Sequence, residues 1–314
     1  MFSIDFILYM LISFVISATT IPFFGKLAYK YGIVDKPDGE LKPHERITPY
    51  LGGLSIFFGV LFASPFEAIT KVSLTILVLL GLYDDIRNLN PKVRLLVEIL
   101  VSFLLVFKYS GISIFTLPYM FVIVALINAV NMMDGLDGVC ASISITAAFG
   151  LTFVVTSQYD RILLFSLIGA LLGYLIYNFP PARIFMGDAG SYLIGGVLSI
   201  GLLSAMRGIN INTSNIVSAY VFVSLFFFDL TAGVLRRLLN GRSPFSGDRG
   251  HIYDKINNVT QDKRKTLMIM MFIQLVILLI GFLAKQSTLL SFVGFVALSM
   301  FFLGLIKWLK LLKY

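Results

Sequence analysis

Residues 266–284 read TLMIMMFIQLVILLIGFLA, a run without a charged side chain. A helix needs about 20 mostly apolar residues to cross the hydrocarbon core of a bilayer, so this run predicts a membrane span. Eleven stretches of this kind lie along the chain, near residues 4–25, 49–65, 70–83, 93–109, 114–130, 138–157, 160–179, 190–206, 215–236, 266–284 and 288–307. The sequence therefore predicts an all-α, polytopic integral membrane protein with ten to eleven transmembrane helices, built as one domain over residues 1–314.

The composition agrees with a protein whose solvent is largely lipid. Of the 314 residues, 58% are hydrophobic and 13% are charged, a balance that water-soluble domains rarely have. A single cysteine, Cys140, excludes an intrachain disulfide, and two histidines are too few for a zinc cluster. Any bound metal is therefore expected to be held by oxygen. The net charge of +8 fits basic loops beside an anionic membrane surface better than a nucleic-acid partner.

The basic residues indicate the orientation. If residue 1 lies outside the cell, 20 of the 25 Lys and Arg residues fall in inner loops, where membrane proteins carry their excess of positive charge. The five in outer loops are Lys71, Lys108, Arg161, Arg207 and Lys285. We expect the N-terminus outside and the C-terminus in the cytoplasm, so the two ends lie on opposite faces. The first span has no small-residue cleavage site after it and is expected to be retained.

The acidic residues gather on the same inner side. Twelve of the 17 Asp and Glu residues lie in predicted inner loops, although carboxylates contribute little to orientation. Another cause is needed, and a cation-assisted site facing the cytoplasm is the obvious candidate. Four separate segments bring polar residues to that side.

The first segment is Gly81-Leu82-Tyr83-Asp84-Asp85, at the end of an apolar run. Two adjacent like charges near lipid are unfavourable, so a cationic partner is expected nearby. Adjacent residues do not share a helix face, and we expect one carboxylate to face the site and the other a basic side chain. The alternative is an acid pair that faces water at a helix end.

The second segment, residues 128–138, reads NAVNMMDGLDG and joins one apolar span to another. Irregular backbone at this depth is tolerated only where it lines a protein or water-filled cavity. Asn128, Asn131, Asp134 and Asp137 offer hard oxygens that suit Mg²⁺, and the two glycines allow a ligand to approach closely. The alternative is a tight turn between helices, because turns favour the same residue types.

The third segment, residues 180–191, reads PPARIFMGDAGS and places a lone acid, Asp188, between glycines just before an apolar helix. Backbone N–H groups at that helix start suit phosphate oxygens, and Asp188 suits a bridging cation. The alternative is a helix capped by Ser191, with Asp188 incidental.

The fourth segment is the longest inner loop, residues 236–265, with the run SPFSGDRGHIYD in its middle. Arg249 and His251 are suited to donate to a diphosphate, since stabilising phosphate charge dominates phosphoryl transfer. Five further basic residues of this loop are expected only to follow the preference for positive charge inside: Arg236, Arg237, Lys263, Arg264 and Lys265. Asp229 lies seven residues before Arg236, about two helical turns, and we expect these two to form a structural ion pair.

In this order, the segments resemble the polyprenyl-phosphate N-acetylhexosamine-1-phosphate transferase family, of the glycosyltransferase family 4 type. The likeness covers essentially the whole chain and includes a motif in the first inner loop, Asp35-Lys36-Pro37, continuing through Lys42, His44 and Thr48-Pro49 to Gly52-Gly53. Each motif alone is weak evidence for the family, whereas five motifs in this order are highly specific to it.

The resemblance implies a Mg²⁺-dependent enzyme of the plasma (inner) membrane, with Mn²⁺ as a substitute and the site on the cytoplasmic face. It implies a UDP-N-acetylhexosamine donor, a polyprenyl phosphate acceptor such as undecaprenyl phosphate, and UMP as the leaving product. By position, Asn131 and Asp188 match the metal ligands, and Asp84, Asp85 and His251 match catalytic residues. The residues assigned to substrate binding are Asp137, which matches the acid that reads uracil, Arg94, which stands where the family usually has a lysine, and Arg249, Lys42, His44, Asn128 and Asp134.

The chain departs from the family where a His-Ile-His-His run is common and this sequence has His251-Ile252-Tyr253-Asp254. The histidine run of the branch that takes the muramyl-pentapeptide donor is missing. UDP-N-acetylglucosamine is therefore the preferred donor, at the first membrane step of a cell-surface polysaccharide such as O-antigen or a cell-wall polymer. UDP-MurNAc-pentapeptide or another UDP-amino sugar is the alternative.

Other classes of protein fit less well. A secondary transporter also combines many helices with broken segments, but it is expected to place charges near the bilayer midplane. Here Glu98 and Asp229 are the main acids inside predicted spans. A scaffold or lipid-binding protein would not need carboxylates from four loops. The oligomeric state is left open, a homodimer included.

Overall fold

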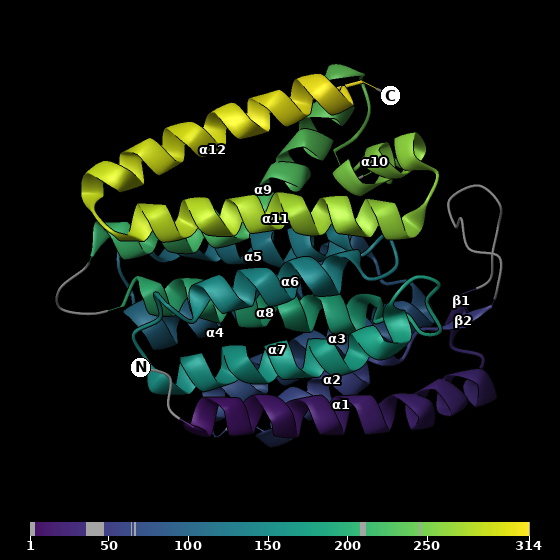
Figure 1. Cartoon of the computed structure of the whole chain (residues 1–314). Helices are drawn as coiled ribbons and strands as arrows, with labels where there is room; N and C mark the ends of the chain where they lie inside the picture. Colours follow the sequence, from purple (N-terminus) through teal and green to yellow (C-terminus); the bar gives the residue numbers. More distant parts are fainter. Residues whose placement is uncertain are drawn as a thin grey trace.

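The computed structural model describes residues 4–35, 47–63, 65, 67–207, 212–244 and 246–313. Over these residues the chain forms twelve α-helices and one antiparallel pair of short strands, β1 (Val34–Asp35) and β2 (Thr48–Pro49) (Figure 1). The helices are α1 (Ile4–Tyr31), α2 (Gly52–Ala63), α3 (Ala68–Arg87), α4 (Pro91–Ser110), α5 (Thr116–Met133), α6 (Val139–Leu151), α7 (Gln158–Asn178), α8 (Gly187–Ala205), α9 (Thr213–Leu239), α10 (Ile252–Thr260), α11 (Lys263–Lys285) and α12 (Thr288–Leu309).

The prediction of an all-α polytopic membrane protein is confirmed. Eleven helices coincide with the eleven predicted spans, and the short helix α10 is an addition inside the loop 236–265. Seven helices are long and apolar enough to cross a bilayer: α1, α5, α7, α8, α9, α11 and α12. Helices α2 and α6, with 12 and 13 residues, are shorter than a full span. The two chain ends lie at opposite ends of the bundle, as expected (Figure 1).

Three helices extend further into the polar segments than the sequence predicts. Helix α3 continues to Arg87 and therefore contains Asp84 and Asp85, which were expected to open a loop. Helix α5 contains Asn128 and Asn131, and α8 already begins at Gly187. A helix keeps its backbone N–H and C=O groups paired at the edge of the lipid, which explains why the polar residues are carried on helix ends.

Helix α8 is the centre of the bundle. Asp188 is its one residue that is not buried. Gly195 and Gly196 allow close approach of Ile127 in α5 and Leu77 in α3, as small residues do between membrane helices. Helices α1 and α12 lie on opposite sides of the bundle (Figure 1), and only 22% of the residues in the membrane-spanning stretch of each helix are buried.

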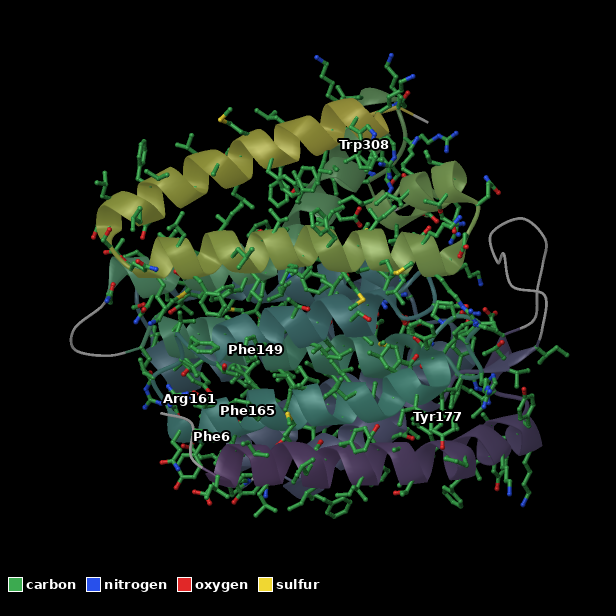
Figure 2. All side chains as sticks on the ribbon, in the orientation of Figure 1. Phe6, Phe149, Arg161, Phe165, Tyr177 and Trp308 are labelled. Atoms are coloured by element: carbon green, nitrogen blue, oxygen red, sulfur yellow. The ribbon has the colours of Figure 1, made fainter. Side chains whose placement is uncertain are left out.

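Helix α1 is docked on α7 by aromatic packing. The rings of Phe6 and Phe165 stack with centroids 5.4 Å apart, and the Arg161 guanidinium lies 5.8 Å from the Phe6 ring centroid (Figure 2). At the other end of the bundle, nitrogen-bearing side chains gather around α10 and the strands (Figure 2). That second end carries every predicted site residue that the structure describes.

The crossing of α3 and α8 allows a test of the fold. A Cβ atom on Gly81 would lie closer than 3.0 Å to backbone atoms of Asp188 and Ala189. We expect Gly81→Ala to push the start of α8 away from α3 and to destabilise the protein by about 1–3 kcal/mol. Thermal unfolding in detergent measures the effect.

The matched control is Gly304→Ala in α12, where nothing lies within 4 Å of the added carbon. Alanine is the better helix former, so this variant should unfold at or slightly above the wild-type temperature. Equal melting temperatures for the two variants would contradict the close crossing.

Candidate active site

Four aspartates lie close together where the last turn of α3, the first turn of α8 and the segment after α5 approach one another. They are Asp84, Asp85, Asp134 and Asp188, here called the carboxylate cluster. The backbone N–H of Asp188 donates to Asp85 Oδ1 at 2.9 Å, and among the acids the charges of Asp188 and Asp85 act most strongly on Asp134. The first three segments singled out from the sequence therefore converge.

Asp84 and Asp85 have different partners, as expected for adjacent helix residues. Asp84 is buried, and its Oδ2 lies 2.9 Å from Arg94 Nη2 while its Oδ1 accepts from the Leu89 N–H at 2.7 Å. Asp85 accepts from the N–H groups of Asp188 and Ala189 at 2.9 and 3.3 Å. A carboxylate at a helix N-terminus is stabilised by the helix dipole. Asp84 therefore pairs with the Arg94 guanidinium, and Asp85 binds the first backbone N–H groups of α8.

Asp188 is held from α5. The Nδ2 group of Asn131 donates to Asp188 Oδ1 at 2.7 Å and to Ser191 Oγ at 2.9 Å. No described residue donates to the Asn131 side-chain oxygen, which is free to bind a cation. Ser191 does not cap the helix, so that alternative is wrong. Gly187 has a φ of +65°, and a Cβ there would lie 2.5 Å from Asp85 Oδ2, so glycine is required.

Asp134 and Asp137 follow α5 directly. Burial raises the pKa of Asp134 well above its usual range, and Asp188, Asp85 and Asp137 raise it further. Asp137 accepts from the Ala182 N–H at 3.1 Å and pairs with Lys263 Nζ at 3.2 Å. Lys263 was expected only to follow the preference for positive charge inside. That expectation is wrong, because this lysine ties the start of α11 to the second segment.

Asn128 is engaged inside the bundle. Its Nδ2 donates to Glu98 Oε2 at 2.5 Å and to the Val124 carbonyl at 2.9 Å. The amide group assigned to substrate binding therefore connects α5 to α4. In the sequence, Glu98 was visible only as an acid inside a predicted span, with no sign of its partner.

The loop before α10 is organised around Asp229 and Asp248. His251 Nδ1 lies 2.7 Å from Asp229 Oδ2, and the Ile252 N–H donates to Asp229 Oδ1 at 2.9 Å. Asp248 accepts from both Arg236 and Arg237, with a shortest distance of 2.8 Å. The predicted ion pair of Asp229 with Arg236 is therefore wrong. The loop folds back and supplies a different acid to the arginine.

These pairs set the charge of the loop. Burial alone would lower the pKa of His251, but Asp229, Asp254 and Asp248 outweigh it and raise that pKa above its usual range. Burial alone would raise the pKa of Asp248, but Arg236 and Arg237 outweigh it and lower that pKa. His251 is therefore kept cationic to a higher pH than a free histidine.

Tyr253 and Asp254, where the sequence departs from the family that it resembles, both have partners in the structure. The Tyr253 ring stacks on His251, and its hydroxyl donates to the Met132 carbonyl at 3.1 Å. Asp254 pairs with Arg249 at 2.9 Å, and burial raises the pKa of Asp254 to about 6 although Arg249 and His251 lower it. Tyr253 thereby connects His251 to the end of α5, next to the carboxylate cluster.

The first inner loop is described only at its edges. Lys42 and His44 lie outside the described residues, so their assignment stays a prediction. Of the flanking motif, Pro49 accepts from the Phe185 N–H at 2.8 Å, and the Gly53 N–H donates to the Met186 carbonyl at 3.0 Å. The end of this motif therefore supports the residues directly before α8.

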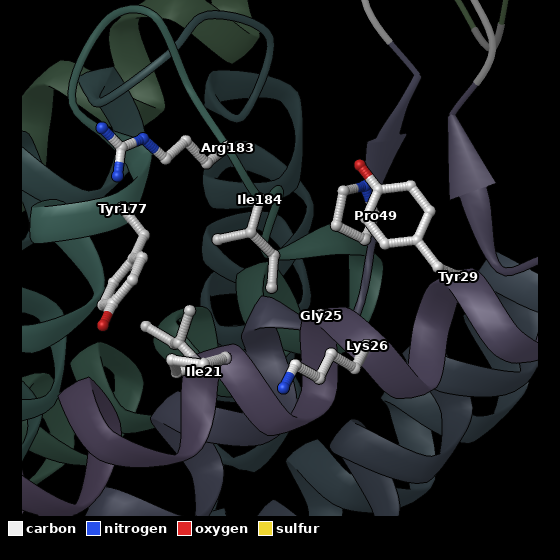
Figure 3. Close-up of a pocket in the computed structure, with 9 residues that line it drawn as sticks. Ile21, Gly25, Lys26, Tyr29, Pro49, Tyr177, Arg183 and Ile184 are labelled. Atoms are coloured by element: carbon white, nitrogen blue, oxygen red, sulfur yellow. The ribbon is translucent and has the colours of Figure 1, made fainter.

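A cavity of about 190 Å³ lies apart from these groups (Figure 3). Its lining includes Lys26 and Tyr29 from α1, Pro49 from β2, and Tyr177 and Arg183 from α7 and the segment after it. None of the predicted site residues that the structure describes belongs to this lining. The cavity is therefore not formed by the carboxylate cluster.

The carboxylate cluster fits Mg²⁺. Within the described ranges, no three His, Cys, Asp or Glu side chains converge into a closed metal cage. Mg²⁺ rarely uses such a cage, because it takes one or two carboxylates and fills its octahedron with water and phosphate oxygens. Asp188 and the open oxygen of Asn131 are suitable donors. Burial is the main cause of the raised pKa of Asp134, and the neighbouring aspartates Asp188, Asp85 and Asp137 raise it further.

The chain matches the model of glycosyl transferase family 4 over residues 68–206. This part of the chain contains α3 to α8 and therefore all four aspartates of the carboxylate cluster. The loop with His251 lies outside the matched segment.

Three named proteins are similar to this chain over most of its length. The "probable undecaprenyl-phosphate N-acetylglucosaminyl 1-phosphate transferase" of Bacillus subtilis strain 168 is 31% identical, over 92% of this chain and 87% of its own length. The "undecaprenyl-phosphate alpha-N-acetylglucosaminyl 1-phosphate transferase" of Thermotoga maritima is 32% identical, over 82% and 84%. The protein of the same name from Escherichia coli strain K12 is 29% identical, over 88% and 83%.

The pairing of His251 with Asp229 can be tested by titration. We expect Asp229→Asn to lower the pKa of His251, because the buried ring loses its nearest anion. Histidine-labelled protein gives a simple NMR spectrum, since the chain has two histidines and His44→Gln assigns them. An unchanged His251 pKa in Asp229→Asn would contradict the pairing.

The same pair predicts the sign of a stability change with pH. A group whose folded pKa is raised stabilises the folded state fully below its unfolded pKa, about 6.5 for histidine. That contribution is lost as the pH rises through the folded pKa. Thermal unfolding of the wild type should show this decrease, and Asp229→Asn should show less of it.

Proposed function

This chain belongs to glycosyl transferase family 4, and we propose that it transfers N-acetylglucosamine 1-phosphate from UDP-N-acetylglucosamine to a polyprenyl phosphate, releasing UMP. The observation that carries the proposal is the carboxylate cluster beside Arg94, at one end of a membrane-spanning bundle. At such a place a water-soluble nucleotide sugar can meet a phosphate on a lipid. The names of the three relatives support the same reaction.

We assign Asp188 and Asn131 as ligands of Mg²⁺, with Mn²⁺ as a substitute. When bound, the cation would offset the charge of the donor diphosphate and of the departing UMP. Asp85 acts through the backbone of α8, since its two hydrogen bonds hold the turn that presents Asp188. Asp134 adds negative charge that favours cation binding.

The reaction joins an oxygen of the acceptor phosphate to the phosphorus that carries the sugar. The bond from that phosphorus to the UMP oxygen breaks, and UMP takes the electron pair. A phosphate monoester has a second pKa of about 6, so the acceptor is mostly ionised near neutrality and needs little help from a base. Asp84, fixed by Arg94 and Leu89, therefore serves mainly to position the acceptor.

Arg94, Arg249 and His251 supply the positive charge that phosphoryl transfer requires. Arg94 is partly exposed beside Asp84, and Arg249 is partly exposed beside Asp254. Asp137, which would read the uracil, uses one carboxyl oxygen for Lys263 and Ala182. Its other oxygen makes no hydrogen bond to a described residue and is suited to accept from the uracil N–H.

The loop of His251 supports a simple amino-sugar donor. Tyr253 and Asp254 bind Met132 and Arg249, so they are not additional donors to phosphate in the way that a histidine run would be. UDP-MurNAc-pentapeptide and other UDP-amino sugars are the alternative donors. The product would be the first lipid-linked intermediate of a cell-surface polysaccharide.

We place the site on the cytoplasmic side of the plasma membrane. The loops at the cluster end of the bundle carry most of the Lys and Arg residues, which membrane proteins keep inside. A secondary transporter would hold its charges near the midplane. Here the acids of the cluster lie at the ends of α3, α5 and α8, which favours transfer chemistry at the membrane surface.

The test is UMP release by the detergent-purified protein with undecaprenyl phosphate and a panel of UDP-amino sugars, each with Mg²⁺ or excess chelator. We expect release only when lipid phosphate and Mg²⁺ are both present, and fastest with UDP-N-acetylglucosamine. No release with any donor would overturn the proposal and favour a binding or transport role.

Two variants should separate the roles of the cluster. Asp188→Ala removes a proposed metal ligand and should lower kcat by about a hundredfold or more, whereas Asp84→Asn should lower it by only about tenfold. The control is Asp262→Asn. Asp262 caps the start of α11, where its Oδ1 accepts from the backbone N–H groups of Arg264 and Lys265. This variant should keep its kcat and lose little stability, because asparagine caps a helix about as well as aspartate does. Equal losses in the two cluster variants, with unchanged Mg²⁺ dependence, would contradict the division of roles.

A further inference from the structure

Glu98 is a buried acid that the proposed reaction does not use. It lies in α4 with 1% of its surface exposed. Its Oε2 accepts from Asn128, whereas its Oε1 is buried and has no partner among the described residues. Leaving a carboxyl oxygen unsatisfied in an apolar setting is unfavourable, so this position requires an explanation.

The missing partner is present one helical turn away. The Nε group of Arg94 is also buried and without a partner among the described residues. Residues four apart on a helix are neighbours on its surface. Arg94 instead forms an ion pair with Asp84, whose Oδ2 lies 2.9 Å from Arg94 Nη2. An unsatisfied donor and an unsatisfied acceptor therefore lie on the same face of α4.

Glu98 also connects Arg94 to the proposed metal ligands. Asn128, its partner in α5, lies three residues before Asn131, which holds Asp188. Four contacts link the ends of α3, α4, α5 and α8: Asp84 with Arg94, Glu98 with Asn128, Asn131 with Asp188, and the backbone of Asp188 with Asp85. Glu98 is the acid that joins α4, which carries Arg94, to α5, which carries Asn131.

We propose that Glu98 is a positioning residue for Arg94. One carboxyl oxygen is fixed by Asn128, and the other accepts from Arg94 Nε when the guanidinium turns from Asp84 to the diphosphate of the nucleotide sugar. Glu98 thereby stabilises the substrate-engaged position of Arg94 and releases Asp84 for the acceptor phosphate. This inference rests on the proposed function.

A lysine in place of Arg94 has no Nε–H to offer at that point of the side chain. The pairing with Glu98 is therefore specific to arginine. The effect of changing Glu98 should depend on which of the two cations is present.

Glu98→Gln is the diagnostic variant. The Val124 carbonyl holds the Asn128 amide in its present orientation, so the new amide must turn its oxygen to Asn128 and its NH2 group to Arg94. Two donors then face each other. We expect the KM for UDP-N-acetylglucosamine to rise by about tenfold, with the KM for undecaprenyl phosphate and the melting temperature close to wild type.

Gln274→Leu is the matched control for a buried polar link. Gln274 in α11 also has one hydrogen bond, to the Phe222 carbonyl, and one buried oxygen without a partner among the described residues. Its removal should lower the melting temperature and leave both KM values unchanged. Glu98→Leu should lower the melting temperature in the same way and also raise the KM for the nucleotide sugar.

A double-mutant cycle completes the test, because residues that act through one contact are not additive. In an Arg94→Lys background, Glu98→Gln should change the KM for UDP-N-acetylglucosamine by less than about twofold. The inference is overturned if Glu98→Gln has wild-type KM values in the Arg94 enzyme, or if its effect is the same in both backgrounds. Absence of turnover in the wild type would instead overturn the proposed function, so the two failures are distinguishable.

Discussion

Four aspartates lie close together at one end of a lipid-embedded bundle, and their mutual repulsion is the constraint that the rest of the site has to offset. Like charges interact strongly where the surroundings are apolar. Arg94 offsets the charge of Asp84, and the start of α8 offsets that of Asp85. Asp134 and Asp188 have no such cationic side chain beside them among the described ion pairs. A site with this imbalance is suited to bind a divalent cation together with phosphates.

The packing of the helices serves that cluster. The start of α8 lies against α2 at Gly53, against α3 at Gly81, and against Asp85 at Gly187, and each contact leaves no room for a side chain. The buried body of α8 then fixes Asp188 relative to Asn131 in α5. The rigid packing of the bundle therefore holds the two proposed metal ligands in fixed positions, as preorganised sites require.

The apolar runs predicted the eleven main helices, and the order of the motifs predicted which segments converge. Helix ends were less predictable, because Asp84, Asn131 and Asp188 look like loop residues until their backbone hydrogen bonds are known. The pairing of Asp229 was predicted wrongly, since Asp248 and the Leu311 carbonyl, both outside α9, compete for Arg236. The contact of Glu98 with Asn128 spans 30 residues, and no local pattern could reveal it.

The most direct test of the account measures whether the substrate-free protein binds Mg²⁺ through the carboxylate cluster. Thermal unfolding of chelator-treated protein is followed as Mg²⁺ is added without substrate. A ligand of the folded state stabilises it by about 2.7 kcal/mol at a hundred times its Kd. The account predicts a saturating rise in melting temperature for the wild type and for Asp262→Asn, and no rise for Asp188→Ala. A wild-type curve that does not respond to Mg²⁺, or an equal rise in Asp188→Ala, would contradict it.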